Sequence, residues 1–187
     1  MKRTSKQLDF VVDGITNSIA LAATGDRFET LVLPATKADI AAASKRAGWL
    51  FDWKLEQIPG QTIYKLVTSK EPKTIQGLAI FKEVEGCVFM PLLESAPHNI
   101  GKEKKYVGVP GNLVAYGCLM SLNKGFDGEL AFDSKTALIS HYEKTLGATR
   151  LYGQRMAILK PAADALIANY FPTSNLKQEN PNEHIGC

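Results

Sequence analysis

The sequence has few cysteines, and their spacing excludes the common cysteine-based frameworks. The 187-residue chain contains three, Cys87, Cys118 and Cys187. They form no even disulfide set, no CxxC pair and no zinc-finger pattern, which indicates a reducing compartment. His184 and Cys187 are spaced like half a metal site, but no further ligand lies near them in the sequence. We therefore predict that the protein binds no metal.

Long apolar runs and targeting signals are also lacking. Asp9 and Asp13 interrupt the apolar stretch that follows MKRTSK, which is not typical of a secretory signal or a transit peptide. No uncharged apolar run reaches the length of a membrane span. We therefore expect a cytoplasmic protein that has no membrane partner.

A strong excess of one charge is absent. The 22 Lys and Arg residues against 19 Asp and Glu give a formal net charge of +3 at pH 7. Nucleic-acid binding normally concentrates many more basic residues in a patch or stripe, so we expect no nucleic-acid partner. An anionic small ligand is compatible with this mild positive charge.

The composition is otherwise that of a globular protein without repeats. Hydrophobic residues make up 45% and charged residues 22% of the chain. These values exclude wholesale disorder and collagen-like sequence, and the length fits one domain. We predict a single domain over residues 1–172, followed by a disordered, Asn-rich tail at 173–187.

Hydrophobic periodicity predicts strands interleaved with helices. Residues 75–97 are expected to form an antiparallel hairpin that turns at Glu85–Gly86. Further strands are expected at 18–23, 28–33, 63–67, 129–132 and 155–159, and helices at 35–48, 109–124, 133–148 and 161–171. This order predicts an α/β fold with a mixed, partly parallel sheet flanked by helices, parallel where a helix separates two strands.

Individual residues refine this interpretation. Trp49, Phe51 and Trp53 form an aromatic strip that is more typical of a core than of a ligand platform. Gly117 and Ser121 are small enough to let the helix at 109–124 lie close to the sheet.

A Gly-bearing turn opens the helix at 109–124, directly after a basic loop. Amides at a helix N-terminus, together with the helix dipole, form an anion site that suits a pyrophosphate. Glycine is also common at ordinary helix beginnings, so the motif alone does not assign a function.

The order of strand, basic loop, turn and helix resembles the GNAT superfamily of acyl-CoA-dependent N-acetyltransferases over residues 75–160. Lys105, Gly108 and Pro110 occupy positions at which that family carries Gln or Arg, then Gly, then Gly or Ala. The chain departs from the pattern at Lys105 and at Pro110, which has no N–H for a phosphate.

A second motif lies on the later helix. Tyr142 precedes Gly147–Ala148, similar to the family's Tyr-to-Gly-Phe spacing with one residue more and Ala in place of Phe. Lys135 stands where the family often has Asn. A subset of the superfamily is closer, and its residues are matched here by Glu94, Ser95, Ala96, Pro97, Asn99 and Ser134.

The resemblance implies acetyl-CoA as the acyl donor. It implies that the pantetheine arm contacts the backbone of the strand ending at Glu94 and that the phosphates meet the turn and helix. The residues implied for this site are Leu92, Leu93, Lys105, Val107, Gly108, Val109, Gly111, Asn112, Leu113, Ser134 and Lys135. The run at 102–105 is either a solvated loop or a place where lysines meet these phosphates.

The resemblance also implies the catalytic groups. Glu94 is the candidate base that deprotonates the amine, directly or through water, and Tyr142 the candidate acid for the departing thiolate. Glu94 is equally compatible with a solvated strand-end carboxylate or a loop-positioning residue, and Tyr142 with a core aromatic. His141 is expected on the surface, and His98 either touches substrate or has no role.

The resulting prediction is an N-acetyltransferase that acts on a primary amine of a small molecule or protein. The alternative is a GNAT-like protein that has lost catalysis and senses acyl-CoA or binds a partner, motivated by Pro110, Lys135 and Ala148. The acceptor pocket is expected in residues 1–70, which could also line a homodimer interface. The acyl-CoA-binding part is expected at 75–160.

Overall fold

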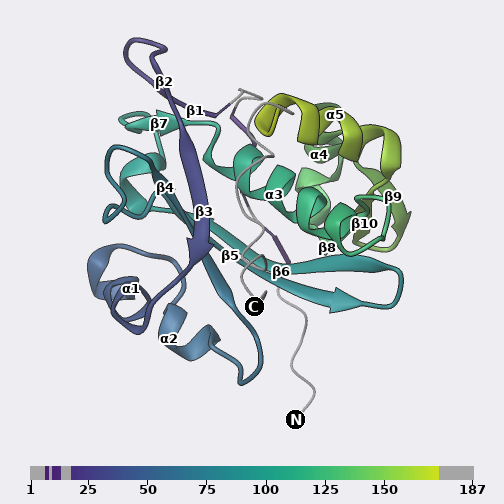
Figure 1. Ribbon diagram of the computed structural model, residues 1–187, viewed down its shortest axis with the longest axis horizontal. Coiled ribbons are helices and arrows are strands. Elements are labelled where there is room, and N and C mark those ends of the chain that lie inside the picture. Colours follow the sequence, from purple (N-terminus) through teal and green to yellow (C-terminus); the bar gives the residue numbers. More distant parts are fainter. Residues whose placement is uncertain (1–6, 9, 14–17, 173–187) are drawn as a thin grey trace, which may run out of the picture.

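A mixed seven-stranded sheet runs through the molecule, and helices cover both of its faces (Figure 1). The computed structural model describes residues 7, 8, 10–13 and 18–172, so the predicted tail at 173–187 lies outside the described residues. In spatial order the strands are β3 (Thr30–Pro34), β4 (Ile63–Thr68), β5 (Gly77–Val84), β6 (Cys87–Ser95), β8 (Leu130–Asp133), β10 (Arg155–Ile158) and β9 (Thr149–Tyr152). This architecture confirms the predicted α/β class.

A second, smaller sheet and eight helical segments complete the described part of the chain. The small sheet has the order β2 (Arg27–Phe28), β1 (Ile19–Leu21) and β7 (Tyr106–Val107). The α-helices are α1 (Lys37–Ala42), α2 (Trp53–Glu56), α3 (Val109–Asn123), α4 (Ile139–Leu146) and α5 (Lys160–Tyr170). Three single-turn 3₁₀ helices are η1 (Lys45–Ala47), η2 (Pro97–Asn99) and η3 (Thr136–Leu138).

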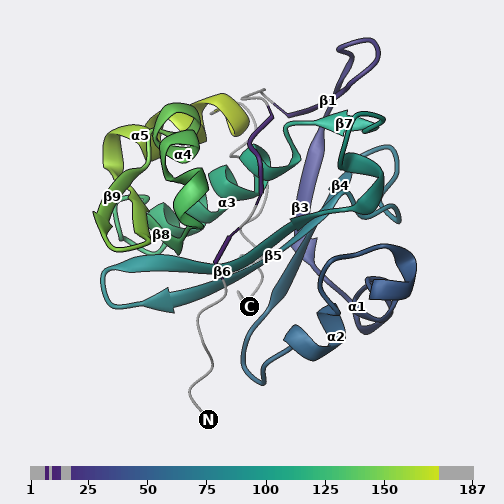
Figure 2. The same ribbon diagram turned by 180° about the vertical axis from the view of Figure 1, so that it is seen from behind.

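Two cores lie on opposite faces of the sheet, because successive strand residues point to opposite sides. On β5, Leu78 and Ile80 belong to the core under α1 and α2, while Ala79 and Phe81 belong to the core under α3, α4 and α5. Figures 1 and 2 show these two groups of helices from opposite sides. Trp53 is fully buried in the first core, as the aromatic strip predicted.

Local sequence signals set the helix ends. Thr36 and Asp39 form a reciprocal capping box that starts α1. Gly147 ends α4 in the left-handed conformation at φ 64°, which glycine adopts without steric cost. Gly117 lets α3 approach the sheet, because a Cβ there would lie 2.6 Å from the Phe81 ring. The close approach predicted for this helix is confirmed.

One edge of the arrangement departs from the sequence prediction. β9 was not predicted, and all four of its residues are exposed, so no burial pattern marks it. Because β9 lies between α4 and β10 in the chain, β10 returns antiparallel to both β9 and β8. Among the described strands, the rule that a helix separates parallel strands holds only for β6 and β8, which flank α3.

β6 and β8 are paired over a short stretch and then separate. Their parallel register contains Val88↔Leu130 and Phe89↔Ala131. Directly beyond Phe89, Met90 and Pro91 of β6 oppose the single residue Phe81 of β5, which makes a β-bulge. Pro91 has no N–H to give to a neighbouring strand. The bulge therefore bends β6 away from β8, and an opening forms between the last residues of the two strands.

Candidate functional site

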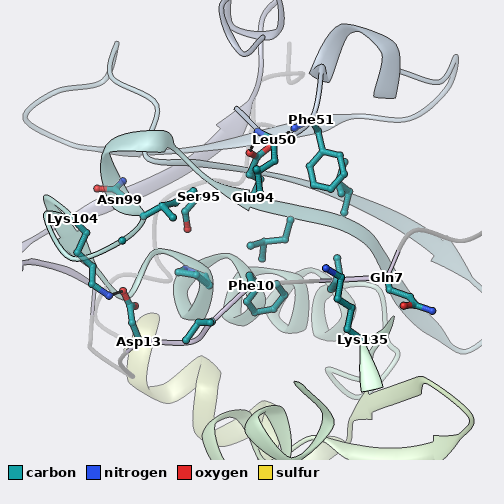
Figure 3. Close-up of a pocket in the computed structure, with 17 residues that line it drawn as sticks. Gln7, Phe10, Asp13, Leu50, Phe51, Glu94, Ser95, Asn99, Lys104 and Lys135 are labelled. Carbon is teal, nitrogen blue, oxygen red and sulfur yellow. Dashed lines mark hydrogen bonds and ion pairs between the residues drawn. The ribbon is translucent and has the colours of Figure 1, made fainter. Parts of the chain in front are cut away.

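A cavity of about 660 Å³ lies at the opening between β6 and β8 (Figure 3). Its residues come from six places: the N-terminal segment, the loop before α2, the end of β6, the loop before α3, the first turn of α3 and the start of η3. They are Gln7, Leu8, Phe10, Val11, Asp13, Leu50, Phe51, Leu92, Leu93, Glu94, Ser95, Asn99, Ile100, Gly101, Lys104, Pro110 and Lys135. Most of these side chains are apolar, Lys104 and Asp13 lie at one end, and Glu94 lies on the wall formed by β6.

The end of β6 forms one wall and includes three of the residues that the sequence singled out. Leu92, Leu93 and Glu94 all line the cavity. The parallel partner strand has already diverged at this height, so the β6 backbone on that side is not used by β8. An extended ligand could hydrogen-bond to a strand backbone presented in this way.

The Glu94 carboxylate is buried and already accepts several hydrogen bonds. Oε1 accepts the backbone N–H of Leu50, and Oε2 accepts the indole N–H of Trp53 at 2.8 Å and the N–H of Phe51 at 3.4 Å. The side chain therefore fixes the loop before α2 at the end of β6. Glu94 is neither a solvated strand-end carboxylate nor a group pointing freely into the cavity.

Burial and hydrogen bonding act on Glu94 in opposite directions. Removal from water raises the pKa of the carboxyl above its ordinary value, and the N–H groups of Leu50, Trp53 and Phe51 counteract part of that shift. A carboxylate with a raised pKa is a stronger proton acceptor than one in water. The group therefore has the raised basicity expected of a general base, and Oε1, which accepts a single N–H, keeps a further acceptor site.

The N-terminal end of α3 already holds an anion supplied by the chain itself. Gly108 caps the helix in the left-handed conformation at φ 86°, and its N–H donates to Asp13 Oδ1 at 2.9 Å. Lys104 Nζ donates to Asp13 Oδ2 at 2.7 Å. Figure 3 shows Lys104 and Asp13 side by side at one end of the cavity. These two donors are suited to a carboxylate or a phosphate.

The other basic residue of this loop lies elsewhere. Lys105 is 3.4 Å from Glu71 and sits over the Tyr106 ring at 5.0 Å, and it does not line the cavity. Its neighbour Val107 pairs with Ala20 in the small sheet. The structure therefore directs Lys104, and not Lys105, to the cavity.

Several predicted residues of α3 are buried against the rest of the fold. Val109 and Leu113 pack against Gly77 of β5, where an added Cβ would lie 2.8 Å from Val109. Asn112 donates its amide to Thr30 Oγ1 at 2.8 Å. Gly111 is buried as well. These side chains position α3 and do not line the cavity. The α3 residue that lines the cavity is Pro110.

The start of η3 contributes Lys135, which lines the cavity opposite β6. Ser134, the residue before it, is fully buried and donates its hydroxyl to the Lys135 carbonyl at 2.8 Å. Ser134 also forms a parallel bridge with Leu8. The serine therefore shapes the backbone at this wall.

Tyr142 and His141 both contact the N-terminal segment. The Tyr142 ring is buried, and its hydroxyl donates to the Phe10 carbonyl at 2.7 Å and accepts the Phe10 N–H at 3.2 Å. His141 Nε2 accepts the Val12 N–H at 2.9 Å. His141 is thus half-buried and engaged, contrary to the surface position expected from the sequence.

The loop after β6 is fixed by Asn99 and Gln76. Asn99 donates to the Gln76 carbonyl and accepts the Tyr106 N–H at 3.1 Å. His98 is 2.9 Å from Gln76 Oε1 and is not among the residues that line the cavity. Burial lowers the pKa of His98, and the positive charge of Lys105 adds to this effect. The loop motif therefore has a structural role at this position.

Sequence reasoning missed the contribution of the N-terminal segment. Asp13 was considered only as an interruption of an apolar stretch, although its carboxylate holds the Gly108 N–H. Leu8, Phe10 and Val12 are buried while Val11 is 60% exposed, an alternation that is typical of a strand. This alternation could have predicted an extended segment that packs against the core. It could not have predicted which strand the segment lies beside.

No protein-family model matches the chain, and no curated protein matches it. Among solved structures, the ribosomal-protein-S18-alanine N-acetyltransferase from Escherichia coli is similar at a TM-score of 0.40 and 15% sequence identity, over 69% of this chain and 90% of that chain. Within residues 7, 8, 10–13 and 18–172, no helix is both long and apolar enough to cross a membrane.

Proposed function

We propose that the protein is an acyl-CoA-dependent N-acyltransferase of the GNAT type that transfers an acetyl group to a primary amine. The observation that carries this proposal is the opening between the parallel strands β6 and β8, with the N-terminal end of α3 at its mouth. The Gly108 N–H and the Lys104 ammonium at this mouth already donate to the carboxylate of Asp13, which supports a site for anionic groups.

The cavity supports a defined placement for acetyl-CoA as a substrate. The backbone of Leu92 and Leu93 would hold the pantetheine arm, and the Gly108 N–H with Lys104 would hold the phosphates. Pro110 gives no hydrogen bond to a phosphate at its position. Bound there, acetyl-CoA supplies the activated thioester, and the cavity residues exclude water from it.

The chemistry requires one proton acceptor and one proton donor. The amine nitrogen attacks the thioester carbonyl carbon, the carbon–sulfur bond breaks, and the thiolate needs a proton. Glu94 would take the amine proton, directly or through water, as its raised pKa favours. Tyr142 would protonate the thiolate, and its hydroxyl is presently oriented by Phe10.

The N-terminal third is the proposed source of acceptor specificity. Leu50 and Phe51 line the cavity from the loop before α2, and Phe10 and Val11 line it from the N-terminal segment. Leu50 is 63% exposed at the cavity mouth. An acceptor that enters the cavity would meet these side chains first.

The test combines cofactor binding with turnover. Calorimetry with acetyl-CoA should show binding, and thiol release should appear with an amine from a panel of polyamines, aminoglycosides, amino acids and lysine peptides. Tyr142→Phe should slow thiol release about tenfold or more, with the Kd for acetyl-CoA changed less than about threefold. Tyr152→Phe is the matched control, because Tyr152 is 68% exposed on β9. Absence of acetyl-CoA binding at millimolar concentration would refute the proposal.

The second candidate is an acyl-CoA-binding protein without catalysis. The three N–H groups on Glu94 favour it, because they use most of the roughly four acceptor sites of the carboxylate for holding the loop before α2. Binding of acetyl-CoA without thiol release from any amine, together with equal behaviour of the wild type and Tyr142→Phe, would select this candidate.

A further inference from the structure

Residues 7, 8 and 10–13, here called the arm, lie in the opening between β6 and β8. Its residues alternate: the backbone N–H groups of Leu8, Phe10 and Val12 donate to Asp133, Tyr142 and His141 in turn. Figure 3 shows the arm crossing the cavity below β6, with Phe10 near its centre. The arm therefore occupies the side of the opening that belongs to β8 and α4.

The end of this arm reaches the anion site. The Asp13 carboxylate accepts the Gly108 N–H at 2.9 Å and the Lys104 ammonium at 2.7 Å, and its side chain is only 14% exposed. Both contacts are charge-assisted, and both donors face the cavity end that the proposed function gives to the phosphates of CoA. One site cannot hold a carboxylate and a phosphate on the same two donors.

We propose that Asp13 is an internal competitor of CoA, so that the phosphates must displace its carboxylate from Gly108 and Lys104 before the cofactor binds. This inference rests on the proposed function for its ligand. The acidic end of the arm has to leave the anion site for CoA to bind, and the Phe10 backbone has to release the Tyr142 hydroxyl before that hydroxyl can act as the proton donor. A competitor inside the chain lowers the apparent affinity by the fraction of molecules in which the site is free.

The proposal distinguishes two adjacent lysines. Lys104 holds Asp13 and lines the cavity, whereas Lys105 is paired with Glu71 outside it. Loss of Lys104 removes the proposed contact with a CoA phosphate and also the ion pair that holds Asp13 in the site. Loss of Lys105 removes the same charge from the same loop and leaves the anion site intact, which makes it a matched control.

The test compares ligands with and without phosphates. Calorimetry should show that Asp13→Ala binds CoA about tenfold more tightly than the wild type, the effect of losing one charge-assisted competitor. Pantetheine, which has no phosphate, should bind both chains equally. Asp164→Ala is the control, because Asp164 forms a comparable lysine pair on the surface of α5, where it is about half exposed. Its affinity for CoA should equal that of the wild type.

The lysine variants give a second, independent readout. Lys104→Gln should lose affinity for CoA and respond little to the additional Asp13→Ala change, because the two residues act on one site. Lys105→Gln should bind CoA like the wild type. A larger loss in Lys105→Gln than in Lys104→Gln would overturn the assignment.

Inorganic pyrophosphate separates this inference from the proposed function. If Asp13→Ala binds pyrophosphate more tightly than the wild type but neither binds CoA, the competition stands and the acyltransferase proposal fails. If CoA binds the wild type and Asp13→Ala with equal affinity, or binds the variant more weakly, the internal competitor is refuted and the acyltransferase proposal is unaffected.

Discussion

A single buried carboxylate links two distant parts of the chain. Glu94 at the end of β6 accepts the indole N–H of Trp53, 41 positions earlier in the sequence, and the backbone N–H of Leu50. Glu94 and Leu50 line the cavity, whereas Trp53 belongs to the core under α1 and α2. A change of charge at Glu94 will therefore alter both the electrostatics of the cavity and the hydrogen bond that holds Trp53 of α2 in place.

The titration of Glu94 is directly measurable through its indole partner. Because burial raises the pKa of this carboxyl above 4.5, the indole N–H resonance of Trp53 should titrate with a midpoint above that value in an NMR pH series. The Trp49 indole is the internal reference. A midpoint at or below 4.5 would mean that the donated hydrogen bonds outweigh burial.

The sign of the stability effect follows from the same shift. A carboxyl whose pKa is raised in the folded state holds its proton more tightly there than in the unfolded chain. Its contribution to the free energy of unfolding is complete below the unfolded-state pKa and is lost as the pH rises through the folded-state pKa. The decline should therefore begin near pH 4.5, the ordinary value for Glu.

Site residues close to one another in the sequence were predictable, and those that meet only through the fold were not. Leu92, Leu93 and Glu94 follow one another on a strand whose apolar pattern is plain. Asp13 meets Gly108 across 95 positions, and no local pattern encodes such a contact. The choice of Lys104 over Lys105 depends on the direction of one loop residue, which the surrounding fold decides.

At the scale of elements, capping and periodicity predicted most of the helices and strands. The hairpin of β5 and β6 turns at Glu85–Gly86 as expected, with Gly86 at φ 76°. β9 escaped prediction because its residues face solvent and their hydrophobicity does not alternate with burial. The separation of β6 from β8 depends on a bulge that Pro91 alone does not specify.

The close packing of α3 gives a prediction at this scale. Gly117→Ala should lower the free energy of unfolding by about 1–3 kcal/mol, because the new Cβ would lie 2.6 Å from Phe81 and 3.0 Å from Leu130. Urea unfolding measures the loss. Asn123→Ala, at the exposed last residue of the same helix, is the control and should cost less than about 0.5 kcal/mol. Equal stabilities for the wild type and Gly117→Ala would contradict the packing.

At the scale of the whole molecule, the arm runs along β8 and α4 where β6 and β8 no longer pair. Leu8 bridges Ser134, and its side chain, with those of Phe10 and Val12, enters the larger core. The Phe10 ring lies 5.0 Å from the Tyr142 ring. The arm is therefore a structural part of the fold as well as an occupant of the opening.

Two neighbouring arm residues separate these contributions. Phe10→Ala should lower the free energy of unfolding by about 2–4 kcal/mol, since a buried aromatic side chain is lost from the core. Val11→Ala should change it by less than about 0.5 kcal/mol, because Val11 is 60% exposed. Chemical denaturation monitored by circular dichroism gives both values. Similar losses in the two variants would show that the arm does not pack as an alternating strand.

The hydrogen bonds between Phe10 and Tyr142 span 132 positions, which has a consequence for how the chain folds during synthesis. During synthesis the arm leaves the ribosome well before its partners on β8 and α4 are made. Contacts this distant close slowly, because a long loop must be ordered before they form. Each new chain therefore passes through a period in which the arm does not yet lie in the opening between β6 and β8.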